Sequence, residues 1–95
     1  MAQTSYYTEE ELAQLGLKSY GEDVRLSRKA SLYGVGNIYI GNHVRIDDFC
    51  ILSGNITIGN YVHVNPFTGI YAGKAGVTLD DFANLASRIT IYAVS

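Results

Sequence analysis

The chain has 95 residues, with seven Lys or Arg against nine Asp or Glu and a formal net charge of −2. Without a basic run it does not fit a nucleic-acid-binding protein, and no apolar stretch approaches the roughly 18 residues of a membrane span. The lone Cys50 excludes an internal disulfide framework and, with an acidic N-terminus that lacks a signal-peptide pattern, indicates a cytoplasmic protein.

The first predicted element is a short helix at residues 9–15. Thr8 and Glu11 have the spacing of a capping box, in which each side chain accepts a hydrogen bond from the other residue's backbone N–H. Gly16 suits the left-handed position that follows a helix. So short a helix is not stable alone, and we therefore expect residues 1–23 to form a helical cap that docks on the following segment.

A repeat dominates the rest of the chain. The motif IGNHV at 40–44 recurs as IGNYV at 58–62 and, with one insertion, as LDDFA at 79–83. Within each copy there is a finer period of six, and the position four residues after each aliphatic residue is also small or β-branched. The aliphatic positions are Ile40, Ile46, Leu52, Ile58, Val64, Ile70, Leu79, Leu85 and Ile91.

A period of six is neither helical nor the alternation of one long strand. It fits short strands separated by corners, three to a turn, so that 18 residues close one triangular coil. Successive coils then stack at the strand spacing of about 4.8 Å, with like residues in interior columns. We expect residues 24–95 to form three to four such coils, with 24–39 as an imperfect first coil and a loop leaving one corner at 73–78.

The repeated pattern of an aliphatic residue, a Gly, Ala, Asp or Glu, and a small residue four positions on resembles the hexapeptide-repeat acyltransferase superfamily. The resemblance covers residues 40–95 well and 24–39 more loosely. It implies an all-β, left-handed parallel β-helix, although the residues by themselves do not give the hand. Its nearest match is to galactoside and maltose O-acetyltransferases and to sugar acyltransferases of surface-polysaccharide synthesis.

Proteins of that family are homotrimers with active sites at the subunit boundaries. They transfer an acetyl group from acetyl-CoA, a co-substrate and not a resident cofactor, to a sugar hydroxyl with a histidine as general base. Asn65 occupies the slot of the family's active-site asparagine, while Phe67 stands where a second asparagine is common. The catalytic histidine would follow directly after Ser95, and the coils that bind most of the coenzyme would come later still. The resemblance is therefore to the N-terminal half of such an enzyme.

Histidine is the side chain expected to remove a proton from the acceptor, and the chain has two. His43 and His63 both fall at outward positions but not in one column. His63 is the better catalytic candidate because Asn65 is close along the chain. The alternative for either histidine is an ordinary surface or subunit contact.

Other groups with chemical potential have simpler interpretations. The pairs Asp47-Asp48 and Asp80-Asp81 fall at coil corners, where aspartate is a natural turn residue. Cys50 fills a small interior position and is expected to be inert. Two histidines out of line and one interior cysteine make no metal-ligand set, so we predict no metal site. Residues that bind the coenzyme are not identifiable from the sequence.

Two functions follow from these observations. The first is a sugar O-acyltransferase represented by an N-terminal portion that is inactive alone. The second is a non-catalytic β-helical assembly or scaffold module, because an open β-helix end exposes strand edges that template further pairing.

Overall fold

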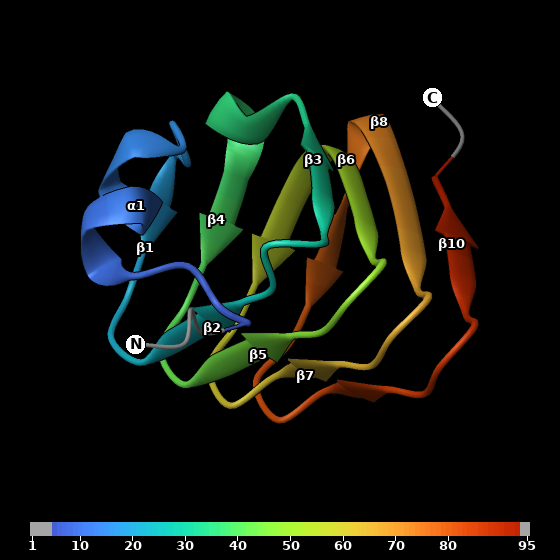
Figure 1. Ribbon diagram of the computed structural model, residues 1–95. Coiled ribbons are helices and arrows are strands. Elements are labelled where there is room, and N and C mark those ends of the chain that lie inside the picture. Colours follow the sequence, from blue (N-terminus) through green and yellow to red (C-terminus); the bar gives the residue numbers. More distant parts are fainter. Residues whose placement is uncertain (1–4, 94–95) are drawn as a thin grey trace.

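The computed structural model describes residues 5–93 as a stack of coils closed at one end by a helix (Figure 1). The elements in chain order are α1 (Glu9–Gln14), β1 (Ser19–Tyr20), β2 (Val24–Leu26), β3 (Ser31–Tyr33), the 3₁₀ turn η1 (Val35–Asn37), β4 (Ile38–Ile40), β5 (Val44–Ile46), β6 (Ile51–Ile58), β7 (His63–Val64), β8 (Gly69–Leu79), β9 (Asn84–Leu85) and β10 (Thr90–Tyr92). Within these residues no helix is long and apolar enough to cross a membrane.

All strand pairs within the coils are parallel, and they form the three faces expected of triangular coils. One face holds β2-β5-β7-β9. The long strands β6 and β8 turn a corner and pair with each other on both sides of it. Before the corner, β6 also pairs with β3, and β8 with β10. After the corner, β6 also pairs with β4, which in turn pairs with β1. The prediction of a parallel β-helix of about four turns is confirmed.

The predicted interior columns are also confirmed. Ile58 pairs in register with Ile40 on one side and Leu79 on the other. The aliphatic residues of the other two columns pair in the same way, as Ile46/Val64/Leu85 and Leu52/Ile70/Ile91. The first seven aliphatic positions are at most 7% exposed, whereas Leu85 and Ile91 are half-buried because a described coil packs on only one side of them.

The helix α1 forms by the local signals that predicted it. Thr8 accepts from the Glu11 backbone N–H at 3.2 Å, and the Glu11 carboxylate accepts from the Thr8 N–H at 2.9 Å. Gly16 has a φ of 88°, as the left-handed residue after the helix requires. Leu12 is buried at 3% exposure, so the helix docks on the first coil through its apolar face.

The first coil begins earlier than the period of six indicated. β1 already pairs with β4, with Ser19 opposite Tyr39 and Tyr20 opposite Ile40. The segment expected to be only a helical cap, residues 1–23, therefore also supplies a strand. The division of the chain at 23/24 stays a prediction.

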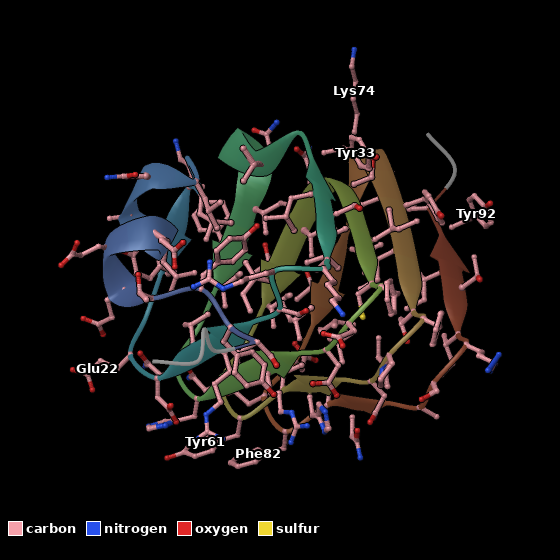
Figure 2. All side chains as sticks on the ribbon, viewed as in Figure 1. Glu22, Tyr33, Tyr61, Lys74, Phe82 and Tyr92 are labelled. Carbon is pink, nitrogen blue, oxygen red and sulfur yellow. The ribbon has the colours of Figure 1, made fainter. Side chains whose placement is uncertain are left out.

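The insertion lies where the spacing indicated, although it begins one residue sooner. The offset between β6 and β8 is 18 residues at Ser53–Tyr71, 19 at Gly54–Gly73 and 21 at Ile56–Val77. Lys74 projects away from the coils at this corner (Figure 2). Ala72 is buried, whereas residues 73–75 are exposed, and the interior column of Ile58 and Leu79 stays in register.

The other two corners carry aromatic residues in left-handed backbone conformation. At one corner His43, Tyr61 and Phe82 all have a positive φ, and their rings stack in sequence at 4.7 and 5.3 Å. At the other, Phe49 and Phe67 stack at 5.1 Å. Ring stacking between coils offsets part of the cost of a left-handed conformation at residues other than glycine.

The attachment of α1 is expected to weaken in acid. Glu11 accepts two hydrogen bonds of 2.6 Å from the Arg28 guanidinium, and these bonds, with the one from Thr8, lower the pKa of Glu11 from 4.5 to about 2. A lowered carboxylate pKa contributes stability that is complete above the ordinary pKa and is lost as the pH falls through the lowered one. The difference in Tm between the wild type and Glu11→Gln should therefore be largest above pH 5 and disappear near pH 2.

Thermal melts across that range measure this dependence. Glu9→Gln is the control, because it removes a charge from the same helical turn and leaves the contact between Glu11 and Arg28 intact. A difference between wild type and Glu11→Gln that stays constant from pH 7 to pH 2 would contradict the prediction.

Candidate functional site

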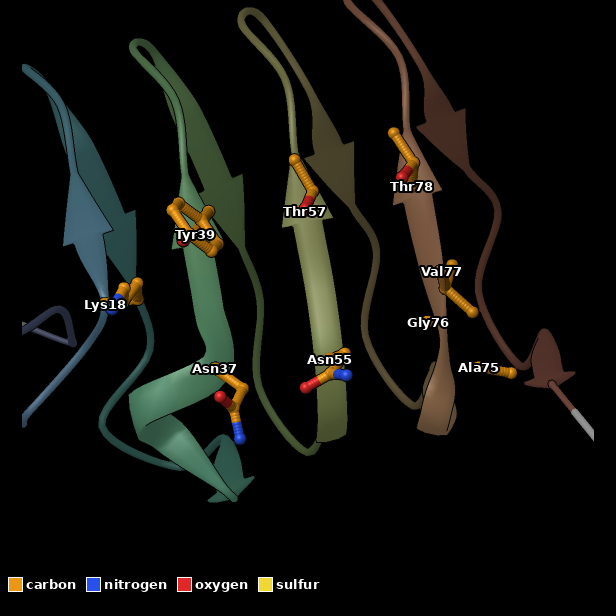
Figure 3. Close-up of a pocket in the computed structure, with 9 residues that line it drawn as sticks. All are labelled: Lys18, Asn37, Tyr39, Asn55, Thr57, Ala75, Gly76, Val77 and Thr78. Carbon is orange, nitrogen blue, oxygen red and sulfur yellow. The ribbon is translucent and has the colours of Figure 1, made fainter. Parts of the chain in front are cut away.

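A polar groove of about 450 Å³ crosses the outward face of β4, β6 and β8 (Figure 3). Asn37 and Asn55 line one side of it, and Thr57 and Thr78 line the other in register. Lys18 lies at one end. The amide, hydroxyl and ammonium groups give the groove hydrogen-bonding capacity, but it contains no residue able to act as a general base at neutral pH.

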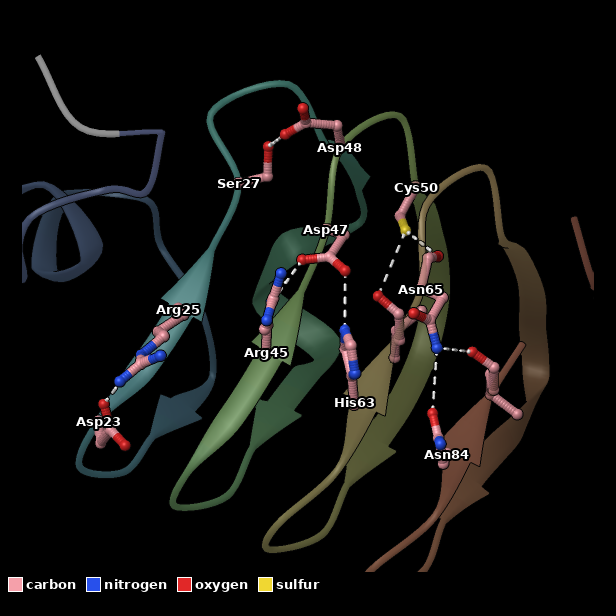
Figure 4. A network of polar contacts seen from close by, with 12 residues as sticks. Asp23, Arg25, Ser27, Arg45, Asp47, Asp48, Cys50, His63, Asn65 and Asn84 are labelled. Carbon is pink, nitrogen blue, oxygen red and sulfur yellow. Dashed lines mark hydrogen bonds and ion pairs between the residues drawn. The ribbon is translucent and has the colours of Figure 1, made fainter. Parts of the chain in front are cut away.

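The face formed by β2-β5-β7-β9 carries the groups with acid–base chemistry (Figure 4). Its outward column runs from Arg25 through Arg45 and His63 to Asn84, each opposite the next in the strand register. Because side chains alternate along a strand, Asp47 and Asn65 point to the same side two residues after Arg45 and His63. Two polar columns therefore stand side by side on this face.

Asp47 joins the two columns. Its carboxylate accepts a hydrogen bond of 2.8 Å from Arg45 Nε and contacts His63 Nε2 at 2.7 Å. The Asp47 side chain is 10% exposed, whereas that of His63 is 34% exposed. The arrangement is a buried carboxylate that fixes the orientation of a partly exposed imidazole.

The charge state of Asp47 determines what His63 can do. Burial raises the Asp47 pKa, but the hydrogen bonds from His63 and Arg45 outweigh that effect and leave the pKa below its ordinary value. Asp47 is then ionised at neutral pH and can only accept, so His63 Nε2 is the donor of this hydrogen bond. In the neutral imidazole this leaves Nδ1 as the proton acceptor.

Asn65, the second residue proposed from the sequence, contributes to coil stacking. Its side-chain Nδ2 donates to Asn84 Oδ1 at 3.0 Å and to the Leu85 carbonyl at 2.7 Å. The backbone carbonyl of Asn65 also accepts from Cys50 Sγ at 3.1 Å. Among residues 5–93, the side-chain oxygen of Asn65 accepts no hydrogen bond, so it is the polar atom available to a ligand.

The structure keeps the two histidines apart, as their spacing indicated. His43 lies at the aromatic corner, where its Nδ1 contacts Asp23 Oδ2 at 3.0 Å and its ring stacks on Tyr61. Cys50 is fully buried, and burial raises the pKa of its thiol, which agrees with an inert interior residue. The described part of the chain contains no group of three or more His, Cys, Asp or Glu side chains able to hold a metal ion.

Asp47 is the residue that sequence reasoning missed, because it was interpreted as a corner aspartate. The signal was present in the period of 18, which places Arg45 next to His63 and Asp47 next to Asn65 on one face. The period does not predict that the Asp47 side chain points toward His63 on the neighbouring coil. The general base expected just after Ser95 lies outside the described residues.

Comparison with known proteins confirms the recognition made from the repeat. Residues 37–72 match the family model described as bacterial transferase hexapeptide (six repeats). The chain is 49% identical over 92 residues to the dTDP-4-amino-4,6-dideoxy-D-glucose acyltransferase of Escherichia coli, covering 94% of this chain and 47% of that protein. The chain is therefore similar to hexapeptide-repeat transferases over residues 37–72 and to a sugar acyltransferase over nearly its whole length.

Solved structures give the same result. Crystal structures of AntD, an N-acyltransferase from Bacillus cereus, superpose with TM-scores of 0.94 for a complex with dTDP-4-amino-4,6-dideoxyglucose and coenzyme A, and 0.93 for a complex with dTDP and 3-hydroxybutyryl-CoA. The identities are 51% and 52%, and the matches cover 97% and 96% of this chain but 49% and 48% of AntD. The β-helix is accordingly left-handed, as the resemblance implied.

The comparisons refine the sequence-based interpretation in two respects. The chain spans about half the length of the curated and solved relatives it matches, corresponding to their N-terminal half. The AntD structures are described as those of an N-acyltransferase in complex with an amino sugar nucleotide, whereas the sequence suggested O-acetylation of a galactoside or maltose. The broader expectation of sugar acyltransferase relatives is confirmed, and the expectation of transfer to oxygen is not supported.

Proposed function

We propose that this chain supplies the N-terminal coils of an acyl-CoA-dependent N-acyltransferase whose acceptor is the amino group of a nucleotide-linked amino sugar. The observation that carries the proposal is identity of 49–51% across nearly the whole chain to proteins named for that substrate or bound to it. Soluble nucleotide sugars and coenzyme A thioesters also fit the cytoplasmic location and the role in surface-polysaccharide synthesis that the sequence suggested.

The reaction needs a proton acceptor. The amine attacks the thioester carbonyl, a C–N bond forms, the C–S bond breaks, and the thiolate leaves and takes up a proton. The attacking nitrogen loses one proton, and His63 Nδ1 is the group on this face that can accept it while Asp47 stabilises the resulting imidazolium. The Asn65 side chain can position the acceptor from the same face, and we expect Asn65→Ala to slow the reaction less than loss of His63.

The test compares two proteins. One is the 95-residue chain, and the other, the extended protein, is this chain joined to the AntD coils that lie beyond the matched half. With acetyl-CoA or 3-hydroxybutyryl-CoA and dTDP-4-amino-4,6-dideoxyglucose, the extended protein should transfer the acyl group. The 95-residue chain should show no transfer above background and weak or no binding of coenzyme A, because it lacks the later coils.

Two outcomes would contradict this proposal. Micromolar binding of coenzyme A by the 95-residue chain in calorimetry would show that the later coils are not needed. An extended protein that folds but stays inert with amino, hydroxyl and nucleotide-linked sugars would favour the assembly-module function.

The chain is also proposed to form a homotrimer. Two corners expose large aromatic side chains, including Phe49 at 50%, Phe67 at 52% and Phe82 at 74%, and exposed aromatic surface of this extent favours association. Light scattering at micromolar concentration should give three times the chain mass. A monomer under those conditions would contradict the prediction.

A further inference from the structure

We propose that the hollow beside the aromatic corner of β2 and β5 binds the diphosphate group of the nucleotide-linked substrate. The hollow measures about 280 Å³ and is lined by Asp23, Arg25, His43, Val44, Arg45 and Tyr61. The inference rests on the proposed function, since it assigns a location to one part of that substrate.

Two arginines give the hollow its affinity for phosphate. Arg25 and Arg45 are register partners on the parallel strands β2 and β5, so they lie side by side on the outward face. Their backbones are about one strand spacing, 4.8 Å, apart. Their side chains are 57% and 50% exposed. Arginine presents a planar fork of N–H donors that matches phosphate oxygens, and adjacent arginines can each hold one phosphate of a diphosphate.

Neighbouring carboxylates hold both guanidinium groups in position. Arg25 Nε lies 3.4 Å from Asp23 Oδ1, and Arg45 Nε lies 2.8 Å from Asp47 Oδ1. Both contacts engage Nε, and Arg45 has a further hydrogen bond with the Tyr6 side chain. Because a guanidinium has five N–H donors, donors remain on both arginines for phosphate oxygens. Ordering a side chain before the ligand arrives reduces the entropy lost on binding.

The charges around the hollow nearly balance in the free protein. The two arginines are offset by Asp23 and Asp47. His43 is bonded to Asp23, and His63 is bonded to Asp47. The other titratable side chains nearby are Tyr61, which lines the hollow, and Tyr6, which hydrogen-bonds Arg45. A diphosphate must therefore compete with two carboxylates. We expect moderate affinity that falls with added salt, because exposed charges are screened at physiological ionic strength.

The strand register relates this hollow to the proposed general base. The column that contains Arg25 and Arg45 continues to His63 and then to Asn84 at the same spacing of about 4.8 Å per coil. A nucleotide sugar with its diphosphate on the arginines would therefore bring its sugar ring over His63, one coil further on. This alignment favours a sugar-linked diphosphate over a free phosphate as the ligand.

Calorimetry with dTDP, thymidine and inorganic pyrophosphate tests the assignment in the extended protein and in the 95-residue chain. dTDP should bind, and Arg25→Gln and Arg45→Gln should each weaken its binding about 10- to 100-fold, the range expected for loss of one charge-assisted contact. Pyrophosphate should show the same dependence, whereas thymidine should bind weakly and equally to all variants. Arg25→Lys should retain part of the affinity because it keeps the charge.

The matched control is Arg88→Gln, which removes an exposed arginine at the other aromatic corner, where its guanidinium lies 5.2 Å from the Phe67 ring centre. It should leave dTDP binding unchanged. Thermal melts of each variant report whether the coils remain folded. Arg25→Gln is the more direct test of the two, because Arg45 contacts Asp47, which also holds the proposed general base His63.

The outcomes separate the two proposals. Equal affinity for dTDP in the wild-type extended protein and in its folded Arg25→Gln variant would overturn the subsite. Acyl transfer by an extended protein that does not bind dTDP would also overturn it. Arginine-dependent dTDP binding by an extended protein that transfers no acyl group would support the subsite and reject the proposed function.

Discussion

Replacing Ile58 with asparagine is expected to lower the free energy of unfolding by about 3–5 kcal/mol. Ile58 is 2% exposed and lies between Ile40 and Leu79 in the interior column. The substitution removes apolar burial and places an amide where the neighbouring coils offer only side-chain carbon, so its polar atoms remain without partners. Urea unfolding followed by circular dichroism measures the change.

The adjacent Thr57→Asn is the control for this substitution. Thr57 is on the same strand but faces outward into the polar groove. An asparagine amide there stays solvated, so Thr57→Asn should change the free energy of unfolding by less than about 0.5 kcal/mol. Melting of Ile58→Asn close to the wild-type temperature would show that residue 58 is not interior. Such a result would reject the register on which the site depends.

In the extended protein, His63→Gln is expected to lower kcat by about 10²–10⁴-fold, the usual contribution of a positioned general base. KM for the nucleotide sugar should change little, because His63 is proposed to move a proton and not to bind the diphosphate. Initial rates at saturating acyl-CoA separate the two parameters. A His63→Gln variant with more than a tenth of the wild-type kcat would place the general base elsewhere, for example just beyond residue 95.

Asp47→Asn distinguishes positioning from a merely structural contact. A neutral amide no longer stabilises the imidazolium that forms during the reaction, so kcat should fall, although less than in His63→Gln, while KM for the nucleotide sugar changes little. Asp47→Glu keeps the charge and should restore part of the rate. A merely structural contact would instead lower the Tm and leave kcat unchanged at temperatures where the variant is folded.

Several features of the fold followed from the sequence because they arise from local spacing. A residue such as Ile58 must be interior once aliphatic residues recur every six positions, since only stacked triangular coils bury all of them together. The helix at Glu9–Gln14 followed from Thr8 and Glu11, which are three residues apart and form their hydrogen bonds within one turn. The outward placement of His63 followed from the same period.

The tertiary structure decided the contacts between coils. The period of 18 set Arg45 beside His63, but the rotamers and the local bend determined that the Asp47 carboxylate reaches His63 across 16 residues of chain. The same is true of Arg28, which holds Glu11 from 17 residues away. Hydrogen bonds of this kind depend on the directions in which side chains leave the backbone, and the spacing along the chain does not fix those directions.

The sequence by itself therefore determined the repeat, the interior columns, the capped helix and the outward face that carries His63 and Asn65. Only the tertiary structure decided that Asp47 is the partner of His63, that the Asn65 amide nitrogen binds the next coil, and that Arg25 and Arg45 share one hollow. The physical reason is that burial follows from periodicity along the chain, whereas a site follows from the angles at which side chains leave neighbouring coils.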